Sequence, residues 1–378
     1  MRPGPTTGRR ILVTGGAGYI GSHSLLPLLE GGHAVCVLDS FCNSRPETLA
    51  VVERLAQRPV LFRNLDLRDG RALSAALHEF HPDAVIHLAG LKSPSVSVAD
   101  PLPYYDNNLV GLVRLLAAMD AIGCRRLLFS SSAAVYGATP ARPVTEAQPL
   151  DPRSPYGRSK AIMEQIVTDW TLAHSGKAAI SLRYFNPIGA HASGRIGDAP
   201  NGIPDSLLPM IARVAAGIVP ELAVHGADFQ TRDGTGERDY PHVMDLARGN
   251  LAALDHLWTM PAGHDCFNLG AGAGVTVLEM IAAFESATGR QVPYRIAARR
   301  PGDCDVSIAD TSRARQILGW RPEHSLQDGC RAAWHWQIGQ GEDCAVSGPP
   351  DRQNPPMPPR TRAKPIGWLD PAKQSPTE

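Results

Sequence analysis

The chain has 378 residues, with 37 basic and 37 acidic side chains and a hydrophobic content of 43%. This balance gives no general attraction to nucleic acid or to an anionic membrane, so we expect neither as a partner. No run approaches the roughly 18 consecutive apolar residues of a membrane span. The seven cysteines are scattered and never spaced C-x-x-C, which argues against a disulfide framework and a structural zinc site. We therefore expect a cytoplasmic protein that binds no metal.

Short apolar, β-branched runs alternate with longer helical patterns through the first half of the chain. The predicted strands cover residues 11–15, 34–39, 59–66, 84–90, 126–132 and 178–186. This alternation predicts an α/β fold, with a Rossmann-type doubly wound parallel sheet in residues 10–186 after a flexible N-terminus, 1–9.

The regular alternation stops after Asn186, where a passage rich in glycine and proline begins. Residues 187–340 are predicted to form a smaller C-terminal α/β domain, and part of this segment is expected to return to the first domain. The proline-rich residues 341–378 cannot bury enough apolar surface to offset their ordering entropy, so they are predicted to be a disordered tail.

A glycine-rich turn, TGGAGYIGSH, follows the first predicted strand and opens the first predicted helix. Its glycines recur at three-residue spacing, at positions Gly15, Gly18 and Gly21. Such a turn lets the backbone approach a pyrophosphate at a helix N-terminus, although a plain tight turn is the alternative. Asp39 ends the second strand, where a carboxylate can bind both hydroxyls of an adenosine ribose. The carboxylate would repel the 2′-phosphate of NADP and therefore favours NAD, although nearby Arg45 weakens this argument. Pro27 predicts a kink or an early end of the first helix.

The stretch SPYGRSK, residues 154–160, predicts a second site. Ser154 suits a helix N-cap and Pro155 a first helical position, so Tyr156 and Lys160 share one helix face. An ammonium and a nicotinamide cation near the phenol would lower its pKa and make the phenolate a general base. The alternative is a buried tyrosine beside a surface lysine. Residues 130–132 are three serines that end the fifth strand at its carboxyl edge, where open α/β sheets bind ligands.

The ordered series of motifs between Arg10 and Gln340 resembles the UDP-glucose 4-epimerase family of extended short-chain dehydrogenase/reductases. The motifs are TGGAGYIGSH, LDSFCNS, HLAGLKS, YYDNN, FSSSAAVYG, SPYGRSK, LRYFNPIGAH, DGTGERDYPHVMDLA, FNLGAG and RRPGD. The resemblance implies an isomerase, a homodimer formed through the helices that include the Tyr-Lys segment, and a tightly held NAD. The implied NAD contacts are Gly15, Gly18, Tyr19, Ile20, Gly21, Asp39, Asn43, Ser44, Asp66, Leu67, Leu88, Ala89, Gly90, Leu91, Lys92, Asn107, Ser132, Tyr156, Lys160 and Phe185.

The resemblance also implies the reaction, with Ser132, Tyr156 and Lys160 as the catalytic residues. Tyr156 takes the proton of the sugar 4-hydroxyl of a UDP-hexose while hydride leaves C4 for NAD⁺. The 4-keto sugar then turns about its link to the diphosphate, and hydride returns to the opposite face. The nucleotide must be clamped while the sugar stays loosely held.

The resemblance implies that residues 187–340 are the UDP-sugar-binding domain. The implied clamps on the nucleotide are Asn186, Arg238 and Arg300, with Asp303 near the uridine ribose. Three positions depart from the family pattern. Ser206, beside Asp205, replaces a nucleotide-binding asparagine, and His225 stands where an aromatic side chain commonly packs on uracil. Ser307 leaves the wall of the sugar pocket small, which predicts that UDP-GlcNAc and UDP-GalNAc are also accepted.

Two other functions are compatible with a dinucleotide-binding fold. A sugar-nucleotide 4,6-dehydratase needs an Asp-Glu couple directly after the strand-end hydroxyl, where this chain has Ala133 and Ala134. A non-catalytic regulatory protein that binds NAD would be expected to lose the pair Tyr156 and Lys160. Both residues are present.

Overall fold

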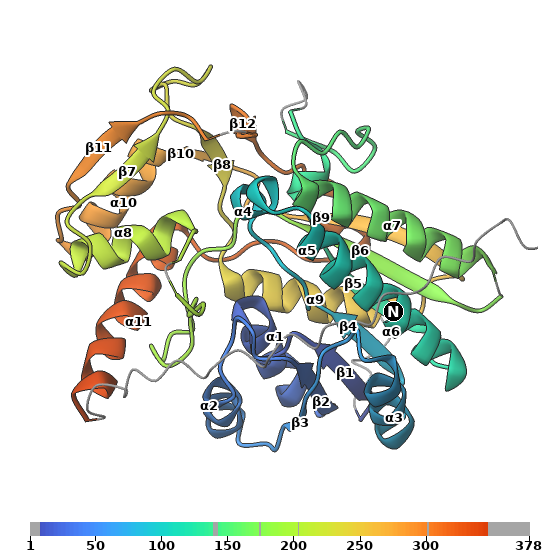
Figure 1. Ribbon diagram of the computed structural model, residues 1–378. Helices are drawn as coiled ribbons and strands as arrows, with labels where there is room; N and C mark the ends of the chain where they lie inside the picture. Colours follow the sequence, from blue (N-terminus) through green and yellow to red (C-terminus); the bar gives the residue numbers. More distant parts are fainter. Residues whose placement is uncertain (1–7, 139–142, 174, 203, 301, 347–378) are drawn as a thin grey trace, which may run out of the picture.

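A seven-stranded, wholly parallel sheet forms the centre of the larger region (Figure 1). The computed structural model describes residues 8–138, 143–173, 175–202, 204–300 and 302–346. In spatial order the strands are β3 (Leu61–Asn64), β2 (Ala34–Asp39), β1 (Arg10–Thr14), β4 (Ala84–His87), β5 (Arg126–Ser132), β6 (Ala178–Tyr184) and β9 (Gly263–Leu269). The order reverses direction between β1 and β4, the point at which doubly wound sheets bind ligands.

Helices cover both faces of this sheet. One face carries α1 (Tyr19–Glu30), α2 (Glu47–Ala56) and α9 (Val243–Leu257), and the other carries α3 (Gly70–Phe80), α6 (Gly111–Ala121) and α7 (Pro155–Ala173). Ile11 and Val13 belong to the first core and Leu12 to the second, because successive side chains of a strand point to opposite faces. Four short helical segments lie between these elements: α4 (Pro94–Ala99), α5 (Leu102–Tyr104), η1 (Tyr105–Val110) and η2 (Ala133–Val135).

The smaller region contains two short sheets packed on helices. Its strands β10 (Gly274–Thr276), β8 (Glu237–Asp239) and β12 (Val306–Ser307) form one sheet, and β11 (Tyr294–Ala297) and β7 (Leu222–His225) form the other. A third core joins them to α8 (Leu207–Ala215), α10 (Val277–Thr288) and α11 (Leu326–Val346), while η3 (Ala314–Leu318) packs near α9. Among the described residues, no helix is both long and apolar enough to cross a membrane.

The fold class is confirmed, and the structure refines several boundaries. Residues of α9 and β9 return to the large sheet, so the chain crosses between the regions more than once. Helix α1 continues past Pro27 to Glu30, so the predicted early end of this helix was wrong. The prediction of a disordered tail was wrong for residues 341–346, because these residues belong to α11, which ends at Val346. The remainder of that tail and residues 1–7 lie outside the described residues.

Candidate functional site

A cleft of about 910 Å³ lies at the carboxyl edge of the large sheet, between the two regions. Every residue predicted to contact NAD lines it: Gly15, Gly18, Tyr19, Ile20, Gly21, Asp39, Asn43, Ser44, Asp66, Leu67, Leu88, Ala89, Gly90, Leu91, Lys92, Asn107, Ser132, Tyr156, Lys160 and Phe185. The cleft is also lined by the residues predicted to contact the substrate: Asn186, Ser206, Arg238, Arg300, Asp303 and Ser307. One continuous cleft therefore holds both predicted sets.

The glycine turn has no room for side chains. Gly15 has a φ of 71°, and a Cβ there would lie 2.7 Å from the backbone nitrogen of Ala89. A Cβ on Gly21 would lie 2.2 Å from the carbonyl oxygen of Gly15. Gly18 is the N-cap of α1 and leaves the helix N-terminus without a side-chain cap. This bare, tightly turned backbone at a helix N-terminus fits a dinucleotide pyrophosphate.

The carboxylate of Asp39 connects the glycine turn to the segment after β2. Its Oδ2 accepts from the backbone nitrogen of Ala17 at 3.0 Å, and its Oδ1 accepts from the backbone nitrogen of Phe41 and from the Ser44 hydroxyl, both at 2.9 Å. A carboxylate offers about four acceptor positions, so these bonds orient Asp39 and still leave capacity for a ribose hydroxyl. The geometry fits the predicted role at the adenosine ribose.

Residues 189–201, which we name the strap, connect the smaller region to three parts of the NAD side of the cleft. The Tyr19 hydroxyl donates to the carbonyl of Gly189 at 2.6 Å, and Lys92 lies 3.6 Å from Asp198. The backbone nitrogen of Asn201 donates to Oδ1 of Asn43 at 3.0 Å. No sequence signal predicted the strap, because its glycines and prolines indicated only a change of domain.

The cap of α7 forms as predicted and places Tyr156 and Lys160 inside the cleft. The Ser154 hydroxyl accepts from the backbone nitrogen of Gly157 at 3.1 Å. Tyr156 and Ser132 both line the cleft, and the Ser132 side chain acts to lower the pKa of the phenol. The Lys160 ammonium donates to the carbonyl of Ser130 at 2.7 Å. The end of β5 thus meets both residues of the pair.

Burial dominates the protonation of this pair. Burial raises the pKa of Tyr156, the nearby Ser132 side chain acts in the opposite direction, and Tyr104 and Asp205 add to the rise. Burial lowers the pKa of Lys160 to about 8, partly offset by the charge of Glu164. The expected fall of the tyrosine pKa toward neutrality is therefore not a property of the protein alone. A cation in the cleft, such as an oxidised nicotinamide, would be required to favour the phenolate.

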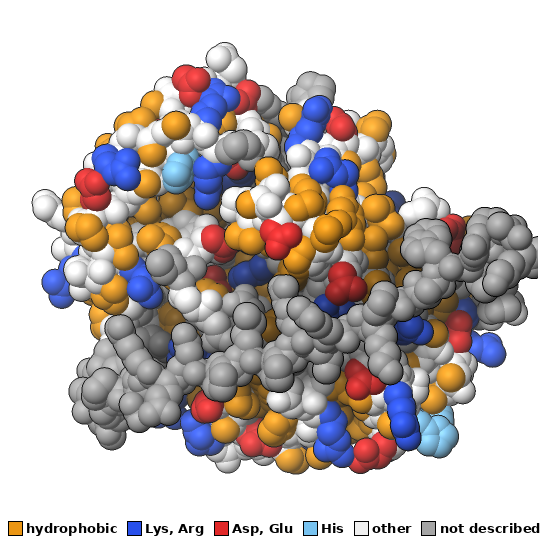
Figure 2. Space-filling view, viewed as in Figure 1, with side chains coloured by type: hydrophobic (Ala, Val, Ile, Leu, Met, Phe, Trp, Pro, Cys, Tyr) orange, Lys and Arg blue, Asp and Glu red, His pale blue; other side chains and the backbone are white. Residues whose placement is uncertain are grey.

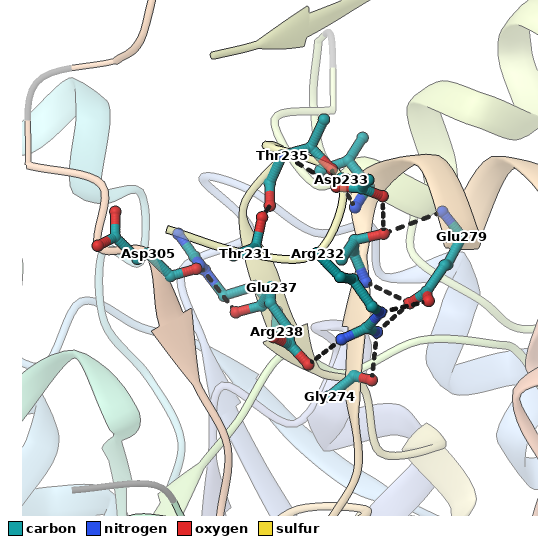
Figure 3. A network of polar contacts seen from close by, with 11 residues as sticks. Thr231, Arg232, Asp233, Thr235, Glu237, Arg238, Gly274, Glu279 and Asp305 are labelled. Atoms are coloured by element: carbon teal, nitrogen blue, oxygen red, sulfur yellow. Dashed lines mark hydrogen bonds and ion pairs between the residues drawn. The ribbon is translucent and has the colours of Figure 1, made fainter. Parts of the chain in front are cut away.

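A polar network fixes Arg238 at the other end of the cleft (Figure 3). Nη1 of Arg238 donates to the carbonyl of Glu237 at 2.9 Å and to that of Asp305 at 3.3 Å. The side chain of Glu237 accepts from Arg232 at 2.6 Å, and Arg232 also pairs with Glu279 at the start of α10. These contacts hold the turn before β8 in one conformation.

The same turn is closed by Asp233, whose Oδ1 accepts from the backbone nitrogen and hydroxyl of Thr235, both at 2.8 Å (Figure 3). Asp303 lies between the two predicted clamps, 3.9 Å from Arg238 and 3.4 Å from Arg300. Arginine suits bidentate contacts to a diphosphate. The arrangement therefore provides two guanidinium groups beside the cleft, with one carboxylate between them.

The remaining substrate positions differ in how they meet the cleft. Asn186 is exposed, while its backbone nitrogen donates to the carbonyl of Asp239 at 3.0 Å. Ser206 is the N-cap of α8 and makes no capping bond with its hydroxyl. Ser307 pairs with Arg238 in the short sheet and is half-buried. His225 is not part of the cleft lining, and its Nδ1 lies 3.0 Å from the carbonyl of Ala298.

The described residues contain no cluster of three or more His, Cys, Asp or Glu side chains arranged to hold a metal ion.

Comparison with known proteins identifies the family of this chain. Residues 12–333 match the family model described as GDP-mannose 4,6 dehydratase. A UDP-glucose 4-epimerase of Bacillus subtilis is 48% identical over 86% of this chain and 96% of its own length. The chain belongs to the UDP-glucose 4-epimerase family.

Solved structures of this epimerase family have the same fold. The Stenotrophomonas maltophila enzyme, with bound NAD and formylated UDP-arabinopyranose, superposes with a TM-score of 0.86 at 45% identity, over 89% of this chain and 99% of its own. The Bifidobacterium longum enzyme, in complex with NAD⁺ and UDP, also gives 0.86, at 44% identity over 88% and 99%. The family model carries the name of a dehydratase, but this chain lacks the carboxylates that a 4,6-dehydratase needs, because the residues after β5 are Ala133 and Ala134.

Proposed function

We propose that the protein is an NAD-dependent isomerase that inverts C4 of a UDP-hexose, interconverting UDP-glucose and UDP-galactose. The observation that carries the proposal is that Tyr156 and Ser132 line the same cleft as the glycine turn and Arg238. The cleft thus combines a dinucleotide cradle, a proton-transfer group and a diphosphate clamp. Bound NAD⁺ would accept the hydride of C4 and return it.

The side chains of the cleft handle the proton. Ser132 and Tyr156 would contact the 4-hydroxyl, and the phenol oxygen would take its proton and later give it back. Lys160 has a pKa of about 8, so below this pH it keeps a positive charge near Ser132 and Tyr156. One proton-carrying group is sufficient because the proton taken when C4 is oxidised is returned when the ketone is reduced. The product then differs from the substrate only at C4.

The clamps must hold the nucleotide while the sugar turns. Arg238 and Arg300 would bind the diphosphate, which competes with the carboxylate of Asp303 for the two guanidinium groups. Asn186 and Ser206 would bind the nucleotide from the facing wall. Ser307 leaves space beside Arg238, and we propose that this space admits the acetamido group of UDP-GlcNAc and UDP-GalNAc.

We also propose that the protein is a cytoplasmic homodimer formed through α4 to α7. Figure 2 shows hydrophobic side chains gathered over α4, α5 and the start of α7. The exposed fractions there include 54% for Val96, 74% for Leu102 and 42% for Ile162, an apolar surface typical of an interface. The free thiols of the described cysteines support a reducing compartment. Leu102→Asp should yield monomers in light scattering, whereas Ile296→Asp, on β11, should leave dimers.

The decisive test of the function needs only the purified protein and two substrates. UDP-galactose and UDP-GalNAc are incubated separately without added cofactor, and the products are separated by chromatography. We expect UDP-glucose in the first reaction and UDP-GlcNAc in the second. A 4-keto-6-deoxy sugar nucleotide would identify a dehydratase. Unchanged UDP-galactose, with NAD present in the protein, would refute the proposal.

A further inference from the structure

Glu164 lies on α7 one turn beyond Lys160 and two turns beyond Tyr156, so the three side chains share one face of the helix. The exposed fractions are 9% for Tyr156, 4% for Lys160 and 5% for Glu164. Glu164 does not line the cleft, so it is not placed to exchange a proton with a substrate. A buried carboxylate is costly unless donors compensate it, so the position of its donors is informative.

The donors to Glu164 come from two neighbouring strands. Its Oε1 accepts from the Ser131 hydroxyl of β5 at 2.5 Å and from Nε of Arg183 of β6 at 3.0 Å. Its Oε2 accepts from Nη2 of Arg183 at 2.7 Å. The arginine is also buried, and its Nη1 donates to the Tyr136 hydroxyl at 2.8 Å. This bidentate pair joins α7 to β6, and the Ser131 hydrogen bond joins α7 to β5.

The three serines that end β5 each meet one residue of the α7 face. The carbonyl of Ser130 accepts from Lys160, and the hydroxyl of Ser131 donates to Glu164. Ser132 lines the cleft together with Tyr156, and its side chain acts to lower the pKa of the phenol. The contact between Ser131 and Glu164 is also joined to β6, because Arg183 binds the same carboxylate. A shift of α7 along β5 would change all three contacts together.

We propose that Glu164 is a positioning residue of the reaction, which holds α7 in register with the end of β5 so that Ser130 and Ser132 meet Lys160 and Tyr156. The inference deepens the proposed function and rests on it for its kinetic readout. The charge of Glu164 has a second consequence, because it stabilises the buried ammonium of Lys160.

The titratable groups that face Lys160 determine how its pKa changes when the charge of Glu164 is removed. They are Tyr156 and Glu164 on α7 and His87 on β4, with Arg183 on β6 behind Glu164. Removal of the Glu164 charge leaves the Arg183 cation uncompensated nearby. Both changes disfavour the ammonium, so the midpoint of the Lys160 titration should move to lower pH.

The first experiment compares Glu164→Gln with the parent holoprotein. Glutamine keeps the size of the side chain, but it removes the charge and one acceptor for Arg183. We expect kcat to fall about 10- to 100-fold with KM within about twofold, as for a small misplacement of catalytic groups. The basic limb of the pH–rate profile should move to lower pH. Ser131→Ala, which breaks only the contact to β5, should lower kcat in the same direction by a smaller factor.

Glu146→Gln is the matched control. Glu146 belongs to the same polar network, since its carboxylate accepts from the backbone nitrogen of Asn268 at 2.8 Å and its carbonyl accepts from Arg183. These bonds lead to β9 and β6 rather than to the serines of β5. We expect parent-like kcat and an unchanged pH profile for this variant. An equal loss in Glu146→Gln and Glu164→Gln would overturn the proposal.

A second measurement does not need turnover. The chain holds five lysines, so labelling of lysine Cε with carbon-13 gives a spectrum in which Lys160 is assigned by its absence in Lys160→Met. The Lys160 midpoint should fall by about half a pH unit or more in Glu164→Gln and stay unchanged in Glu146→Gln. An unchanged midpoint in folded, NAD-loaded Glu164→Gln would overturn the inference even if the protein proved to epimerise no UDP-hexose. Should Glu164→Gln not fold, Ser131→Ala with parent kcat would overturn it.

Discussion

Gly15→Ala tests whether the glycine turn is shaped by close approach of the backbone. Gly15 has a φ of 71°, so alanine costs about 1 kcal/mol in this left-handed conformation. Its Cβ would also lie 2.7 Å from the nitrogen and 2.8 Å from the Cα of Ala89, both backbone atoms that cannot rotate away. A forced backbone shift of this kind costs roughly 2 kcal/mol more. The shift would separate two walls of the NAD cradle.

Gly123→Ala provides the matched control, because Gly123 has a φ of 73° and a Cβ added there would meet nothing within 4 Å. It should lose about 1 kcal/mol of unfolding free energy in a denaturant titration and keep its NAD. Gly15→Ala should lose about 3 kcal/mol and most of its NAD, measured by absorbance after release from the denatured protein. Equal unfolding free energies and equal NAD contents of the two variants would refute this account of the turn.

Three further predictions address the cleft. Turnover should fall as the pH rises through about 8, because Lys160 loses its ammonium there, and a pH–rate profile that stays flat to about pH 10 would contradict this role. Asp198→Asn should release NAD about fivefold faster at low salt, since the ion pair between the exposed Lys92 and the buried side chain of Asp198 contributes on the order of 1 kcal/mol, and the difference should shrink at high salt; equal release rates at low salt would exclude a retaining role of the strap. Ser307→Tyr should lower kcat/KM for UDP-GalNAc at least about tenfold and spare UDP-galactose, and a variant that keeps both activities would show that this wall does not set the pocket size.

Local sequence signals predicted the elements of the fold well. Residues 34–39 and 126–132 form β2 and β5 with the predicted bounds, because buried parallel strands have continuous apolar or β-branched runs between turns. Ser154 and Pro155 predicted the start of α7, because capping depends on neighbouring residues. The return of β9 to the large sheet had no local signal, since strand order is decided by packing between distant segments.

The residues that the sequence proposes for the site line one cleft, but their contacts could not be predicted. Spacing placed Tyr156 and Lys160 on one helix face, yet only the fold shows that the ammonium bonds to Ser130 and that burial raises the tyrosine pKa. Glu164 could have been noticed at the next helical turn, but its partner Arg183 lies on another strand. Desolvation and partners from other elements are invisible to periodicity, which explains why these features required the structure.

The most direct test of the central claim is the epimerisation rate of Tyr156→Phe in its NAD-loaded form, with UDP-galactose as substrate and no added cofactor. Phenylalanine keeps the ring and its packing and removes only the oxygen that carries the proton. The account predicts a fall in kcat of about a thousandfold with NAD content unchanged. A Tyr156→Phe protein that forms UDP-glucose at the parent rate would contradict it.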